Sequence, residues 1–226
     1  MLRTLRVFCA ADASGGNELG VFLDGAEVPD AERQAVAHDL GYSETVFVDD
    51  VERAELRIFT PEVELALAGH PLVGTAWLLR ETGTVPELLR PPAGEVSVRF
   101  ADELSFVAAD PEWAPRFDFV EVDSPAKVDE LDGAPEGYGN VGVWAWLDQD
   151  AGAIRERVFV PEEGIPEDEA TGAAALRLVA ELGREIEIHQ GRGSVIRACP
   201  LDDGRVEIGG ATVLDEVRSY RAPAGR

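Results

Sequence analysis

Two stretches of the chain, residues 57–83 and 157–183, repeat one pattern of residues. Aligned without a gap, seven of their 27 positions are identical, including an Arg-x-Phe-x-Pro-Glu start and a final glycine. Each stretch predicts a strand, a loop and a helix, because Gly83 and Gly183 stand where a left-handed residue ends a helix. Two generic strand-loop-helix units could match by coincidence. The shared start and end favour a duplication, which predicts two similar halves with a cleft between them.

The rest of the chain reads as short strands with few helices. Helices are expected over residues 31–40, from Pro71 to the residue before Gly83, and over residues 172–182. Strands are expected over residues 5–8, 20–23, 45–48, 56–60, 96–100, 104–108, 141–147, 186–189, 194–198, 205–208 and 211–220. This mixture is typical of the α+β class. We expect two halves, residues 1–100 and 101–226, with the last strand able to return to the first half.

The chain is strongly negative. It has 44 acidic residues against 20 basic ones, a net charge of −24, and Lys127 is its sole lysine. Such a chain repels phosphate, so neither nucleic acid nor an anionic membrane surface is expected as a partner. An acidic surface with almost no lysine favours adaptation to concentrated salt, where charge repulsion is screened. A GC-rich genome, which favours arginine over lysine, is the alternative.

Several other classes of protein do not fit. No apolar run approaches the roughly 20 residues that cross a bilayer, and the N-terminus lacks the apolar region of a signal peptide, so we expect a cytoplasmic protein. Cys9 and Cys199 are too few for a disulfide scaffold, and we interpret both as structural. The three histidines have no zinc-ligand spacing, and there is no phosphate-binding loop. We therefore expect neither a metal nor a cofactor.

Each half places small residues at the start of its helix. The first loop, residues 68–75, contains Gly69, and the second, residues 167–174, contains Gly172. A helix start offers unpaired backbone N–H groups and the positive end of the helix dipole, which together attract an anion. Ordinary helix capping explains either loop alone. When the two loops are taken as a duplicated pair, a site that holds a substrate carboxylate in one cleft is as well supported as ordinary capping.

Three titratable side chains lie in or near these loops. Glu44 stands where a helix-ending turn enters an apolar strand, so its carboxylate could be partly buried and suited to transfer a proton. His70 and Asp168 lie in the two loops, and a histidine with two carboxylates can relay protons without a metal. On local sequence alone, an exposed acid is the stronger interpretation of Glu44. For His70 a packed or capping side chain, and for Asp168 a helix cap, are as well supported as a functional role.

Six motifs, in their order along the chain, resemble the phenazine-biosynthesis PhzF-like family. They are Gly16-Asn17, Ser43-Glu44-Thr45-Val46-Phe47, Arg57-Ile58-Phe59-Thr60-Pro61, residues 64–76, residues 167–174 and Gln190-Gly191. The resemblance spans most of the chain. It implies a diaminopimelate-epimerase-like α+β fold of two pseudo-symmetric halves. Each half would be a curved mixed β-sheet around a central helix, with the active site between the halves.

The resemblance also implies an activity. Members of the family are cofactor-independent isomerases or epimerases that move a proton on a small carboxylic acid, and they are commonly homodimers. The matching catalytic positions are Glu44 as the general acid/base, with His70 and Asp168 assisting. The matching substrate-binding positions are Asn17, Gly69, Gly172 and Ala173.

Three departures from the family pattern argue against the phenazine substrate itself. Ala173 stands where a serine is usual, and Glu169 stands where a proline is usual and adds a negative charge near the expected anion site. The chain is also shorter than typical members. The alternative function is a non-catalytic protein that keeps the cleft to sense a small metabolite. A racemase that uses two cysteines is disfavoured, because neither cysteine begins a helix that would stabilise its thiolate.

Overall fold

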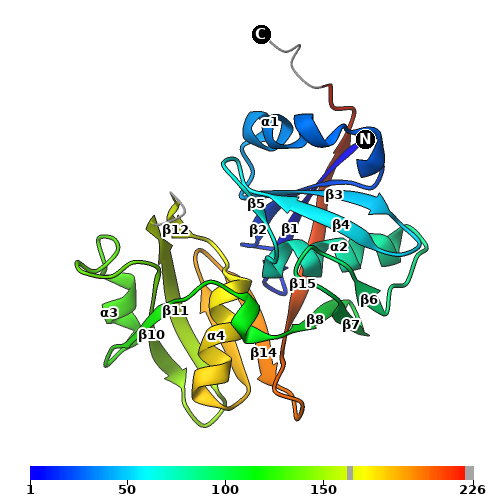
Figure 1. Cartoon of the computed structure of the whole chain (residues 1–226). Coiled ribbons are helices and arrows are strands. Elements are labelled where there is room, and N and C mark those ends of the chain that lie inside the picture. The colour runs from blue at the N-terminus through cyan, green and yellow to red at the C-terminus, as the bar shows by residue number, and fades with distance from the viewer. Residues whose placement is uncertain (162–164, 222–226) are drawn as a thin grey trace.

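The computed structural model describes residues 1–161 and 165–221 (Figure 1). Its helices are α1 (Asp30–Leu40), α2 (Gly69–Glu81), α3 (Pro125–Asp129) and α4 (Gly172–Leu182), with short 3₁₀ turns η1 (Gly25–Glu27) and η2 (Pro111–Trp113). The strands of the first part of the chain are β1 (Leu2–Cys9), β2 (Asn17–Phe22), β3 (Glu44–Asp50), β4 (Glu55–Phe59), β5 (Glu64–Leu65), β6 (Leu88–Leu89), β7 (Val96–Ala101) and β8 (Leu104–Ala109). Those that follow are β9 (Asp118–Glu121), β10 (Val141–Asp148), β11 (Ala153–Val160), β12 (Ile165–Asp168), β13 (Ile186–Gln190), β14 (Ser194–Pro200) and β15 (Val206–Arg218).

The last strand, β15, connects the two groups of strands. Its first part pairs with β14 and β8, and its second part pairs with β1. On one side the order runs β15-β1-β2-β3-β4-β5, and on the other it runs β15-β14-β13-β11-β10-β9. The sequence predicts two strands here, 205–208 and 211–220, and that prediction is wrong. Gly209 and Gly210 do not break the strand; a Cβ on them would lie 2.2 Å from Phe106 and 2.8 Å from Phe8, so glycine permits close packing.

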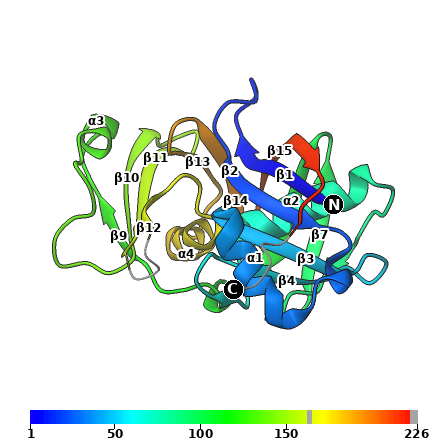
Figure 2. The same cartoon turned by 90° about the horizontal axis from the view of Figure 1, so that it is seen from above.

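Two long helices, α2 and α4, pack against the strands. Helix α2 is buried along almost its whole length and contacts β1, β2, β3, β8 and β15. Helix α4 buries the face that contacts β14 and β15 and ends at Gly183, whose φ of 64° is left-handed. Figure 2 shows α4 nearly end-on, between β11, β12 and β14. None of the helices in the described residues is long and apolar enough to cross a membrane.

The repeated Arg-x-Phe motif makes the same contacts in both halves. Arg57 on β4 pairs with Glu64 at 2.6 Å and stacks over Phe59, with 5.3 Å from its guanidinium carbon to the ring centroid. Arg157 on β11 pairs with Glu167 at 2.7 Å and stacks over Phe159 at 5.2 Å. The strand that pairs with each motif is also in the same register: Thr45 of β3 lies opposite Phe59, and Val141 of β10 lies opposite Phe159. These matched contacts support a duplication.

The ungapped alignment nevertheless does not pair equivalent residues at the starts of the two helices. The glutamate that pairs with the motif arginine follows it by seven residues in the first half and by ten in the second. The second loop is therefore three residues longer (10 − 7), so Gly69 corresponds to Gly172 and His70 corresponds to Ala173. Glu162, which the ungapped alignment pairs with Glu62, lies outside the described residues.

The excess of acids leads to a prediction about salt. With a net charge of −24, the folded protein should gain stability from low to molar potassium chloride, because salt screens the repulsion between like charges. Thermal melts across a potassium chloride series measure this effect. Matched melts in sucrose, which favours burial without screening charge, serve as the control. A melting temperature that stays constant or falls with salt would instead favour a GC-rich genome as the explanation for the near absence of lysine.

Candidate active site

The starts of α2 and α4 lie against each other at Gly69 and Gly172. A Cβ on Gly69 would lie 2.7 Å from the Cα of Gly172, and a Cβ on Gly172 would lie 2.8 Å from the Cα of Gly69. Only glycine allows two backbones to approach this closely. The first N–H groups of both helices are thus brought to one place, where their partial positive charges add.

Placing a methyl group between the helix starts should separate them. We expect Gly172→Ala to destabilise the fold by roughly 1–3 kcal/mol, because its Cβ would overlap backbone and Ile208. Gly133→Ala is the matched control, since nothing lies within 4 Å of its Cβ position. Thermal melts of both variants measure the difference. Equal stability of the two variants would mean that the helix starts are not in contact in solution.

Glu44 and His70 meet beside these helix starts. Glu44 is the first residue of β3 and is 9% exposed, whereas His70 is the second residue of α2 and is 4% exposed. His70 Nε2 lies 3.0 Å from Glu44 Oε2. The two atoms do not form an aligned hydrogen bond, and neither has another hydrogen-bonding partner among the described residues. Both polar atoms are therefore available to a bound molecule.

Asp168 stands at the end of β12 and faces the same place. Its carboxylate accepts hydrogen bonds from Thr171 Oγ1 and from Asn17 Nδ2, each at 2.7 Å. Burial raises the pKa of Asp168, and the nearby Glu44 charge adds to this rise against the lowering effect of His70. Burial also opposes a charge on His70, but the two carboxylates outweigh it, so the pKa of His70 is raised. Both groups therefore hold their protons to higher pH than usual.

The three titratable groups line one small cavity of about 50 Å³. Gly69, Gly172 and Ala173, at the starts of α2 and α4, also line it. The remaining walls are mostly apolar, from Leu65, Leu67, Ala68, Pro115, Phe117, Val160 and Ile165, together with Thr171. A carboxylate in a largely apolar pocket can exchange a proton with a bound carbon acid while water is kept out. Among the described residues, no group of three or more His, Cys, Asp or Glu side chains is arranged to bind a metal ion.

Asn17 lies behind Asp168 rather than on the cavity wall. Its Nδ2 donates to Asp168 Oδ1 and to the carbonyl oxygen of Ala170 at 3.1 Å, and its Oδ1 accepts a 2.8 Å hydrogen bond from Ser43 Oγ. These bonds occupy both amide hydrogens. In this structure the contacts of Asn17 thus hold Asp168, and the position is absent from the residues that line the cavity.

Sequence reasoning did not identify three polar residues that build this network. Ser43 fixes Asn17, and Thr171 donates to Asp168. Gln190 Nε2 donates to the Asp168 carbonyl oxygen and to Thr171 Oγ1, each at 2.9 Å. All three belong to motifs of the family resemblance, but no local pattern showed that they converge on Asp168.

The carboxylate of Glu169 contacts the turn between β13 and β14. Its Oε1 accepts hydrogen bonds from the backbone N–H of Arg192 at 2.7 Å and from Ser194 Oγ at 2.9 Å. Its carboxyl group also fills the space beside Gly191, where a Cβ would lie 2.3 Å from it. The carboxylate of Glu169 thus holds the turn between β13 and β14, and the effect of its charge on the expected anion site stays a prediction.

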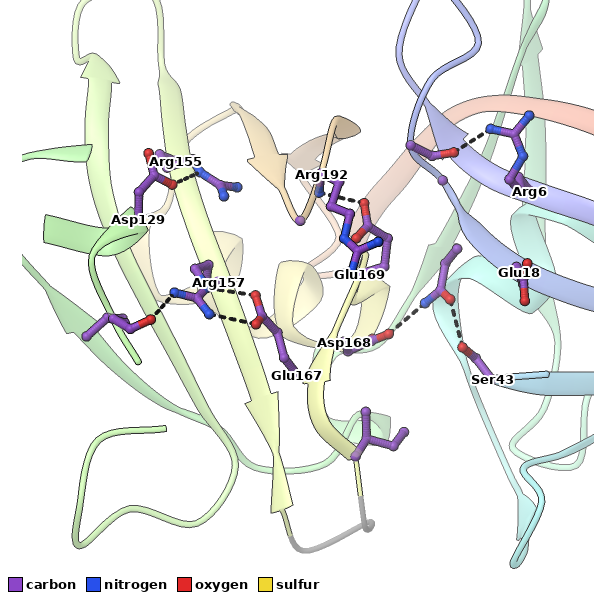
Figure 3. Close-up of a pocket in the computed structure, with 16 residues that line it drawn as sticks. Arg6, Glu18, Ser43, Asp129, Arg155, Arg157, Glu167, Asp168, Glu169 and Arg192 are labelled. Atoms are coloured by element: carbon purple, nitrogen blue, oxygen red, sulfur yellow. Dashed lines mark hydrogen bonds and ion pairs between the residues drawn. The ribbon is translucent and has the colours of Figure 1, made fainter. Parts of the chain in front are cut away.

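A wide polar groove of about 820 Å³ adjoins the small cavity (Figure 3). The two share Asp168 and Ile165. The strands β11 and β12 form one side of the groove, and the start of β2 forms the other. The buried site therefore lies next to a route from the surface.

Comparisons with known proteins agree with one another. The family model described as phenazine biosynthesis-like protein matches residues 6–128. The trans-2,3-dihydro-3-hydroxyanthranilate isomerase of Pseudomonas fluorescens is 30% identical over 78% of this chain and 78% of that enzyme. An uncharacterized isomerase of Pasteurella multocida is 41% identical over 37% of this chain and 31% of that protein. The crystal structure of a PhzF-family phenazine biosynthesis protein from Enterococcus faecalis has a TM-score of 0.78 at 22% identity, covering 94% of this chain and 95% of that one, which confirms the predicted fold class.

Proposed function

This chain belongs to the phenazine biosynthesis-like family of isomerases, and we propose that it moves a proton between carbons of a small carboxylic acid without a cofactor. The observation that supports this most is the buried Glu44–His70 pair beside the abutting helix starts. The same residues line a cavity with Asp168.

In the proposed reaction the substrate carboxylate binds at the N–H groups that begin α2 and α4. Glu44 accepts a proton from a carbon next to an electron-withdrawing group, and the C–H electron pair spreads into that group. The helix starts stabilise the charge that develops. Protonated Glu44 then returns the proton to a second carbon, so charge and atoms balance. His70 and Asp168, whose pKa values are raised, lie in the same cavity and assist the transfer.

The cavity restricts the substrate. At about 50 Å³ it is far below the roughly 300–1,000 Å³ of a pocket for a drug-sized ligand. Ala173 supplies no hydroxyl group there. The relative from Pseudomonas fluorescens is named for a carboxylic acid, dihydro-hydroxyanthranilate. We infer that this chain takes a small acid of the same general class with fewer polar contacts at the Ala173 position.

Deuterium wash-in tests this proposal. The protein is incubated in heavy water with a panel of small unsaturated and hydroxylated carboxylic acids, and substrate mass is followed. We expect one acid to gain deuterium, and we expect the rate to survive dialysis against a chelator. Loss of exchange after dialysis would contradict cofactor independence. Binding without any exchange would instead indicate the metabolite sensor.

The homodimer implied by the family stays a prediction, which sedimentation velocity tests.

A further inference from the structure

The polar groove contains an unusual concentration of arginine for so acidic a protein. Four arginines line it: Arg6, Arg155, Arg157 and Arg192. Two of them are committed to the fold. Arg6 binds Asp215 and the carbonyl oxygens of residues 13 and 15. Arg157 binds Glu167 and the carbonyl oxygens of residues 128 and 131.

The other two arginines have hydrogen-bond donors to spare. Arg155 uses Nε for Asp129 and Nη1 for the carbonyl oxygens of residues 156 and 189, and no bond of the described residues uses its Nη2. Arg192 is exposed, and within the described residues only its backbone N–H is bonded, to Glu169. In Figure 3, Arg155 extends from β11 toward the turn that carries Arg192. Two guanidinium groups thus present uncommitted N–H donors to one groove.

Asp129 pairs with Arg155 Nε, but no acid of the groove is hydrogen-bonded to Arg155 Nη2 or to the Arg192 side chain within the described residues. Asp129 and Glu167 bind arginines, and Glu169 binds the β13–β14 turn. Asp168 is held by Asn17 and Thr171. The remaining acid, Glu18, lies on β2 across the groove from Arg155 and Arg192 (Figure 3). Five acids and four arginines line the groove, so it carries no net positive charge. What it offers an anion is the N–H donors of Arg155 Nη2 and of the Arg192 guanidinium, which are unpaired in the part of the chain that the structure describes.

We propose that Arg192, with Arg155 Nη2, binds an anionic group, either a carboxylate or a phosphate. Guanidinium groups bind both through charge-assisted, paired hydrogen bonds. Because the groove meets the buried cavity at Asp168, this anion would be a second charged group of the substrate, a conclusion that rests on the proposed function. The substrate is then a dianion whose first carboxylate lies at the helix starts and whose second anionic group lies at Arg192.

Direct binding tests the site without any need for turnover. The intact protein is labelled with ¹⁵N and titrated with succinate, with inorganic phosphate and with neutral succinamide at one fixed salt concentration. The arginine Nε–H signals are followed. We expect succinate, phosphate or both to shift Arg192, and succinamide to shift nothing. The stronger of the two anions identifies the carboxylate or the phosphate as the natural group.

Two matched variants isolate the role of Arg192. Arg192→Gln should weaken the binding of the anion roughly tenfold or more, the usual result of losing a charge-assisted hydrogen bond. Arg197→Gln removes the same charge from an exposed position on β14 outside the groove, and should leave the affinity unchanged. Equal affinity of wild type and Arg192→Gln, equal weakening in both variants, or no anion binding by wild type would each overturn the proposal. If wild type binds the anion at Arg192 but no acid gains deuterium in the wash-in experiment, the proposed reaction is wrong and the anion site stands.

Discussion

Replacing Glu44 by glutamine should lower the rate of deuterium exchange roughly 10²–10⁴-fold, which is the usual contribution of a positioned acid/base. Glutamine keeps the length of the side chain and can still fill the space beside His70, but it does not accept a proton at neutral pH. The loss should therefore appear in kcat, with little change in KM.

The control for this variant is Glu32→Gln, which removes an exposed carboxylate from α1 and should exchange at the wild-type rate. Single-turnover exchange in heavy water gives the rate of each protein, and ligand titration gives the affinity. Full exchange by Glu44→Gln on a true substrate would show that another group is the base.

Replacing Glu156 by glutamine should stabilise the protein, and the gain should grow with pH. Glu156 is completely buried, and neither carboxylate oxygen has a hydrogen-bonding partner among the described residues. Burial raises the pKa of Glu156 from 4.5 to about 8. The unfolded chain thus releases this proton near pH 4.5 while the folded protein keeps it until about 8. The contribution of this protonated carboxyl group to the stability of the fold is therefore fully present below pH 4.5 and is lost as the pH rises toward 8.

The size of this effect follows from the linkage between pKa and stability. At pH 7 the wild type should be weakened by roughly 3 kcal/mol relative to pH 4.5, at about 1.4 kcal/mol per pH unit. Glutamine has no such proton, so Glu156→Gln should melt roughly 6–12 °C above wild type at pH 7 and close to it at pH 4.5. Glu181→Gln, an exposed change on α4, controls for net charge. If the difference in melting temperature between Glu156→Gln and wild type did not change with pH, Glu156 would not be buried and protonated in the folded protein.

Local patterns predicted most helices and strands, because apolar periodicity and helix-ending glycines are properties of short segments. The continuous β15 was missed because Gly209 and Gly210 resemble a turn until Phe8 and Phe106 are seen to pack against them. The three-residue offset between the repeats was missed because the longer loop hides the equivalence of Glu64 and Glu167.

The site was predictable only in part. The family resemblance pointed to Glu44, His70 and Asp168, and the structure brings them to one cavity. The polar contacts behind them join residues far apart in sequence, such as Asn17 and Asp168, so no short motif reveals them. Glu156 was also hidden. The sequence analysis did not single it out, and only the alternation of β11 in the structure shows that it is turned inward between Arg155 and Arg157.

The central claim is that the substrate carboxylate binds between the starts of α2 and α4 with a carbon in reach of Glu44. A crystal structure of Glu44→Gln with the substrate that wash-in identifies tests this most directly. We expect the carboxylate at the N–H groups beside Gly69 and Gly172, and the exchanging carbon next to residue 44. A substrate bound elsewhere, with the helix starts empty and residue 44 remote from the exchanging carbon, would contradict the account.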